Sequence, residues 1–174
     1  QHVPTGNQIW FPAFITQFTE TFTSNWRSEP VMGRPDHLKT FTGTSRAVSL
    51  GWDCPAADAK EAVSNLKACG RLAQFLYGSY HDPKNSLSMT GAPVLKVKFA
   101  NLLQDCSANS SYPGGVEAII KSFVYEPVPD AGFFDSSVDF AHGEMLAPRV
   151  VTCMITMDII HMHDVGWRNN PEKK

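Results

Sequence analysis

One amphipathic helix lies in a chain whose other long segments alternate between apolar and polar residues, and this contrast most constrains the fold. Residues 58–77 place apolar side chains three and four positions apart, which predicts a helix with one apolar stripe. Asp58 is the expected N-cap, Glu61 its capping-box partner and Gly78 a left-handed stop. The stripe consists of Ala62, Val63, Leu66, Cys69, Leu72, Ala73, Leu76 and Tyr77. A helix of this kind buries one side only, so we expect it to cover a sheet.

The segments on both sides of this helix show the two-residue period of strands. Residues 14–26 combine four threonines with alternating apolar positions, and residues 38–53 alternate around Gly43. Gly43 predicts a turn or a bulge, which leaves open a hairpin or two short strands there. The expected strands are residues 14–26, 38–53, 95–99, 117–126 and 150–163. Many strands and one long helix predict an antiparallel sandwich with a packed helix, of mainly-β or α+β class.

One of these strands, residues 117–126, is apolar on both faces. Ile119, Ile120, Phe123, Val124 and Tyr125 include both odd and even positions. A strand of this kind lies either deep in a sandwich or under another chain. The sequence therefore predicts substantial burial of Phe123 and Tyr125, within the subunit or between subunits.

Length and charge bound the class of protein. The chain has 174 residues, of which 43% are hydrophobic, and this is the size of a single domain. Lys and Arg number 15 against 17 Asp and Glu, so the formal charge is −2 and no nucleic-acid or anionic-membrane partner is indicated. No apolar run reaches about 18 residues, and no signal peptide is visible. We expect one domain over residues 14–167, an N-terminal arm over 1–13 and a C-terminal tail over 168–174.

Four cysteines, Cys54, Cys69, Cys106 and Cys153, show no metal-binding or compact disulfide spacing. Free thiols in a reducing compartment are the expected state.

Candidate catalytic groups are few. His161 and His163 are two apart on a predicted strand and precede Asp164, so they could hold a transition metal, but no third or fourth ligand follows a known spacing. A cysteine nucleophile with His81 or His142 lacks a local signature. We therefore expect no catalytic residue, no cofactor and no metal, with a metal-dependent hydrolase using His161 and His163 as one alternative.

Short motifs in a distinctive order span residues 14–167. Gly33-Arg34-Pro35-Asp36 begins the series, and it ends with His161-Met162-His163-Asp164-Val165-Gly166-Trp167. The intervening motifs occupy residues 42–56, 61–66, 76–80, 92–102, 127–135 and 148–151. In this order the chain resembles baseplate proteins of contractile-tailed bacteriophages, of the tail-tube initiator or hub–tube adaptor type.

The resemblance implies a tail-tube-like fold, a β-sandwich or partial barrel with one flanking helix, and a structural rather than enzymatic role. Subunits of this type join edge to edge into a ring, here expected to be hexameric, whose inner strands surround a DNA channel. The implied partners are other copies of the chain, the tail tube protein, and hub and wedge proteins of the baseplate. DNA would pass without sequence-specific binding, and the protein would belong to the virion after assembly in the bacterial cytoplasm.

Five aromatic residues are candidate anchors, either in the core or between subunits: Trp26, Trp52, Phe123, Tyr125 and Trp167. Some relatives carry a peptidoglycan-binding LysM module after the closing Gly-Trp, whereas here only residues 168–174 follow. A saccharide- or peptidoglycan-binding module with aromatic platforms therefore remains a further alternative.

Overall fold

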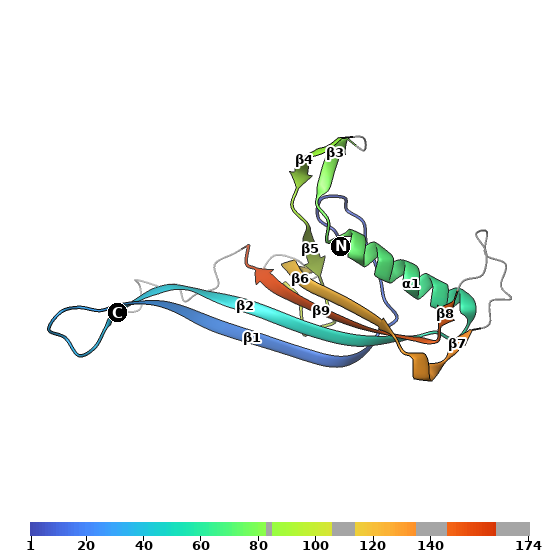
Figure 1. The fold of residues 1–174 in the computed structure, drawn as a ribbon, viewed down its shortest axis with the longest axis horizontal. Coiled ribbons are helices and arrows are strands. Elements are labelled where there is room, and N and C mark those ends of the chain that lie inside the picture. Colours follow the sequence, from blue (N-terminus) through green and yellow to red (C-terminus); the bar gives the residue numbers. More distant parts are fainter. Residues whose placement is uncertain (83–84, 106–113, 135–145, 163–174) are drawn as a thin grey trace, which may run out of the picture.

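A computed structural model of the chain describes residues 1–82, 85–105, 114–134 and 146–162. Its main feature is a five-stranded antiparallel sheet in the order β1-β2-β9-β6-β5. The strands are β1 (Phe14–Glu29), β2 (Leu38–Pro55), β9 (Val150–Ile160), β6 (Val116–Pro127) and β5 (Val94–Val97). Helix α1 (Ala59–Gln74) lies across one face of the sheet (Figure 1). The mainly-β antiparallel class predicted from the sequence is confirmed.

Smaller elements complete the described part of the chain. Strands β3 (Ser79–Asp82) and β4 (Asn85–Gly91) form a hairpin, and β7 (Phe133–Phe134) pairs with β8 (Ala147–Pro148) after a short 3-10 helix, η1 (Pro129–Ala131). Within the described ranges, α1 covers the core face of the five-stranded sheet in the place where a sandwich would have a second large sheet.

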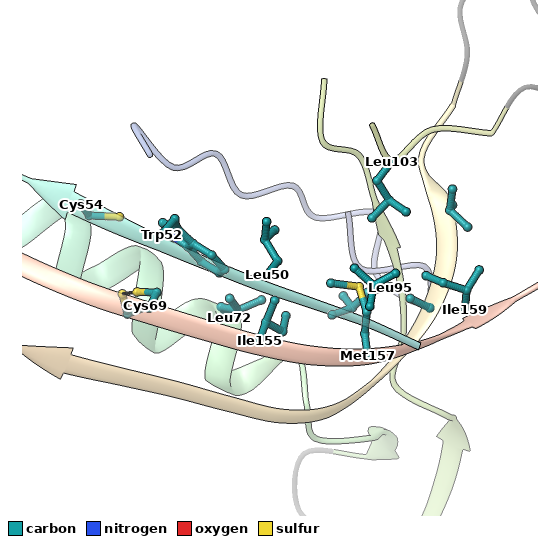
Figure 2. Packing of buried hydrophobic residues seen from close by; sticks show 14 of the residues in the cluster. Leu50, Trp52, Cys54, Cys69, Leu72, Leu95, Leu103, Ile155, Met157 and Ile159 are labelled. Carbon is teal, nitrogen blue, oxygen red and sulfur yellow. Dashed lines mark hydrogen bonds between the residues drawn. The ribbon is translucent and has the colours of Figure 1, made fainter. Parts of the chain in front are cut away.

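The core lies between α1 and the sheet, where the period-two pattern of β9 places alternate side chains. Val151, Cys153, Ile155, Met157 and Ile159 are all buried, as the alternation predicts. They are paired in register with the buried residues of β2, namely Val48, Leu50, Trp52 and Cys54. Figure 2 shows Trp52, Leu50 and Leu72 gathered in this layer.

Helix α1 begins as the sequence predicts and ends earlier. Asp58 Oδ1 accepts a hydrogen bond from Glu61 N at 2.7 Å, while Glu61 Oε2 accepts one from Ala57 N at 2.8 Å. The helix ends at Gln74 instead of near Tyr77, and Phe75 is its C-cap in right-handed helical conformation. The N–H groups of Leu76 and Tyr77 bond three residues back in a tightened turn, so the predicted left-handed stop at Gly78 is wrong.

Two strands also differ from their predicted extents. Residues 38–55 form one continuous 18-residue strand instead of a hairpin or two short strands. Of the two alternatives for Gly43 (φ +150°), a turn or a bulge, the structure has the β-bulge, opposite Asn25 and Trp26. Strand β9 ends at Ile160 and not at His163, so His161 lies beyond the strand.

The N-terminal residues cover one edge of the sheet. Val3 N donates to Val94 O at 3.0 Å, and Lys96 N donates to Gln1 O at 2.7 Å, so residues 1–3 pair with β5. Between them, the side chain of His2 is only 4% exposed and its ring stacks on Phe75 at 4.8 Å between centroids. The first residues of the expected N-terminal arm, residues 1–13, are therefore held against the domain.

We expect His2 to make stability depend on pH. Its pKa is lowered by burial and then by the positive charge of the amino terminus, so the folded protein keeps the ring neutral. The unfolded chain binds a proton near pH 6.5, and stability should fall as the pH drops below that value. Urea unfolding midpoints at pH 7.5 and 5.5 should differ more for the wild type than for His2→Phe. Equal pH dependence in the two proteins would contradict this expectation.

Candidate functional site

Two edges of the sheet are open, and they lie on opposite sides of the same four strands. Strand β1 has 16 residues and, among the residues that the structure describes, pairs on one side only, with β2. On the far side, β5 covers β6 only from Val116 to Ile119, which leaves residues 120–127 of β6 without a neighbour on that side within the described part of the chain. Open edges present rows of unpaired backbone N–H and C=O groups that can pair with another strand.

The directions of the strands make these two edges complementary. The strands β1, β2, β9 and β6 alternate in direction, so β1 and β6 are antiparallel to each other. A second copy related by rotation would therefore bring its β6 beside β1 in antiparallel orientation. The two edges also lie at the same level, because Phe14 and Glu126 end one cross-strand row and Thr21 and Ile119 end another.

The face of the sheet opposite α1 carries small polar side chains and, in other rows of the same face, the exposed apolar side chains of Phe14, Ile119, Val124 and Met154. Cross-strand partners share a face, and one row across four strands consists of Thr19, Ser49, Thr156 and Ser122. In another row of the same face, Thr152 Oγ1 donates to Asp53 Oδ1 at 2.7 Å. We call this surface the hydroxyl face.

Charges on the hydroxyl face are acidic or paired. Lys121 Nζ lies 2.7 Å from Asp158 Oδ2, and Lys96 Nζ lies 3.2 Å from Glu117 Oε1. Asp53 and Glu126 add carboxylates in the row of Thr152. Besides apolar side chains, this face therefore offers phosphate groups hydroxyls and carboxylates, and Lys96 and Lys121 of its described strands are engaged by acids.

A two-stranded arm extends the sheet well beyond the other elements. Its residues 21–45 are all exposed except Gly43, and Figure 1 shows the β1–β2 ribbon projecting past the ends of β9 and β6. An isolated two-stranded ribbon is marginally stable in water. A ribbon of this length is therefore expected to be covered in an assembly.

Aromatic side chains lie along one face of the arm. Phe22 is 64% exposed with the Arg46 guanidinium 5.6 Å from its ring centre, and Arg46 pairs with Glu20. Further out, Trp26 (57% exposed) and Phe41 (52% exposed) pack edge to face at 5.2 Å. Phe18, which packs on the core, belongs to the same face of β1, so the register continues the apolar core face along the arm.

The structure separates the candidate anchors. Trp52 is 4% exposed and belongs to the core, whereas Trp26 lies on the arm. Phe123 packs partly against the core and stacks with the 46% exposed Tyr125 at 6.0 Å, and both belong to the stretch of β6 with the open edge. Strand β6 is therefore not deep in a sandwich. Trp167 lies outside the described residues.

The sequence pattern alone does not distinguish Phe22 and Phe41 as exposed residues of the arm. The spacing of Phe14, Phe18, Phe22 and Trp26 at every fourth residue was the available signal. This spacing places the four side chains on one strand face. It does not show how far along that face α1 covers the strand.

The expected metal ligands are not brought together within the described residues. His161 follows the end of β9, and His163 and Asp164 lie outside the described ranges. No group of three or more His, Cys, Asp or Glu side chains in these ranges is arranged to hold a metal ion.

An apolar cavity of about 410 Å³ lies between the N-terminal segment, the end of α1 and the core face of the sheet. Ile9, Phe11, Trp52, Phe75 and Phe99 are among its lining residues. Its charged lining groups are Lys96 and Lys98, and no His, Cys, Asp or Glu contributes to the described wall. This lining offers apolar contact and no acid–base pair.

No protein-family model matches the chain, and no curated protein is significantly similar to it. Among the described segments, no helix has the length and apolar character needed to cross a membrane.

Proposed function

We propose that this protein is a structural, ring-forming component of a phage contractile-tail baseplate, which connects the hub to the tail tube and initiates tube assembly around the DNA channel. The observation that carries the proposal is the pair of open, oppositely directed edges on β1 and β6. A contact between two different edges is heterologous, and repeating it generates a ring when the rotation between copies closes. The order of motifs that resembles tail-tube initiators and hub–tube adaptors is a second, independent support.

In the proposed ring, β1 of one copy pairs with residues 120–127 of β6 in the next copy. Each copy then contributes β1, β2, β9 and β6 to one continuous antiparallel sheet, in which the open stretch of β6 and the facing part of β1 are paired. This pairing would also cover Val124 and Tyr125, which are nearly half exposed in the single chain. The two-sided apolar pattern of β6 is explained by such an interface.

The hydroxyl face would line the channel, and α1 would lie on the outside of the ring. DNA moves through a channel most freely when the wall offers no unpaired cations, since each lysine or arginine that neutralises a phosphate strengthens binding. The paired Lys121 and Lys96 and the carboxylates of Asp53 and Glu126 meet this requirement. DNA would therefore pass without sequence-specific contact.

The arm would extend from the ring toward the next component of the tail. Its exposed Phe22, Trp26 and Phe41 provide an aromatic surface of the kind that anchors protein interfaces. The tail tube protein and the hub and wedge proteins of the baseplate are the proposed partners.

The mass of the native particle tests the proposal. Native mass spectrometry with negative-stain imaging of the same sample should show rings with a fixed number of subunits, or stacks of such rings. A subunit that remains monomeric both alone and when mixed with the tube protein of its own particle would contradict the proposal.

A further inference from the structure

Three buried thiols gather where α1 crosses the sheet. Cys69 of α1 and Cys153 of β9 are both 0% exposed, and their sulfur atoms lie 3.6 Å apart. Cys54 of β2 is 1% exposed and interacts with Cys153 as well. Figure 2 shows Cys54 and Cys69 together at this end of the core.

The sulfur atoms of Cys69 and Cys153 are in van der Waals contact and not bonded. A disulfide requires about 2.05 Å between sulfur atoms, so an approach of about 1.5 Å would join them. Cys69 and Cys153 belong to different elements and are separated by 84 positions in the chain. A bond between them would fix α1 to the central strand of the sheet.

The hydrogen bonding within the cluster distinguishes the two thiols. A hydrogen bond with Cys153 lowers the pKa of Cys69, and a hydrogen bond with Cys153 also lowers the pKa of Cys54. The pKa of Cys153 is raised, because its proton is held by the two neighbouring sulfur atoms and by burial. Cys69 is therefore the more readily ionised member of the contacting pair, and the thiolate is the form that attacks a disulfide.

We propose that Cys69 and Cys153 form an intramolecular disulfide when the protein meets a small disulfide oxidant such as oxidised glutathione. The Cys69 thiolate attacks one sulfur of the oxidant and releases a glutathione thiolate. The Cys153 sulfur then attacks the Cys69 sulfur of the mixed disulfide and releases the second glutathione. Two protein thiols are oxidised, one disulfide is reduced, and the two thiol protons pass to the two glutathione molecules.

Burial makes this reaction depend on local opening. Neither sulfur is accessible in the closed structure, so the oxidant reaches Cys69 only when α1 separates from the sheet. The reaction is therefore slow in the native protein and accelerated by low, non-denaturing urea. The thiols stay reduced during folding in a reducing compartment and become bonded after exposure to an oxidising one.

Intact mass and peptide mapping test the proposal on the full chain with Cys106→Ser, which leaves the three core thiols. After incubation with oxidised glutathione and alkylation of the remaining thiols, one disulfide should join Cys69 to Cys153 while Cys54 is alkylated. The urea midpoint should rise, and a thiol reductant should reverse both changes. The Cys54→Ser variant should still form the bond, and Cys69→Ser should not.

Three results would overturn the proposal: alkylation of all three thiols after oxidation in low urea, a bond between Cys54 and Cys153 as the main product, or an unchanged urea midpoint in the bonded protein. Should Cys69→Ser fail to fold, the mapping on the Cys54→Ser protein still decides the pairing. The proposal concerns the fold of one subunit, so its outcome is independent of ring formation.

Discussion

Proline at one of two neighbouring positions in β1 should abolish ring formation while the subunit stays folded. In an antiparallel pair, consecutive residues direct their N–H groups alternately toward the partner strand and away from it. Of Glu20 and Thr21, one N–H therefore points toward β2 and the other toward the open edge. Proline at either position removes the backbone N–H of that residue, and the proline ring obstructs a strand that approaches on that side.

The two variants, Glu20→Pro and Thr21→Pro, should consequently differ. The variant that loses the inward N–H should be clearly destabilised, because proline removes a hydrogen bond of the β1–β2 ladder. The variant that loses the outward N–H should retain wild-type circular dichroism but sediment as a monomer. Glu20→Ala and Thr21→Ala are the matched controls, and both should still assemble, since Glu20→Ala removes only one partly exposed ion pair with Arg46.

Rings formed at wild-type concentration by both proline variants would show that the β1 edge is not an interface. If the alanine variants are monomeric as well, the interface depends on the side chains of β1 and not on its backbone. The comparison thus tests strand pairing separately from side-chain contact.

The period of hydrophobic residues was sufficient to predict the core but not its limits. The alternation in β9 predicts Val151, Cys153, Ile155 and Met157 as one buried face, because a strand at the centre of a sheet has neighbours along its whole length. The capping residues Asp58 and Glu61 are local, so they marked the start of α1 correctly. Its end was not local: Leu76 and Tyr77 continue the helical period, yet Tyr77 is exposed beyond the sheet.

The candidate interfaces depend on strand register. Register is set by long-range pairing and not by local sequence, so the sequence does not predict these interfaces. The sequence indicates that β6 is apolar on both faces, but its open edge exists because the short strand β5 pairs with Val116 to Ile119 and no further. Likewise, the pairing of residues 1–3 with β5 joins segments more than 90 residues apart, and no local signal marks it. Long-range pairing decides which strand positions remain open.

The two tryptophans of the β1–β2 pair should respond in opposite ways to the same substitution. Trp52→Ala removes a side chain that is 4% exposed beneath α1, and it should lower the free energy of unfolding by about 3–5 kcal/mol. Trp26→Ala removes a 57% exposed side chain whose described ring contact is Phe41, and it should lower that free energy by less than about 1 kcal/mol. In the assembly the order should reverse, because truncating an aromatic hot-spot residue at an interface costs about 2 kcal/mol or more of binding free energy. Tyr77→Ala, which removes a 73% exposed aromatic side chain remote from the arm, is the control and should change neither quantity.

Urea unfolding of the monomer and the concentration at which particles dissociate measure the two effects. If Trp26→Ala particles dissociate at the same concentration as the wild type, the aromatic face of the arm does not serve as an interface, and its exposure needs another explanation.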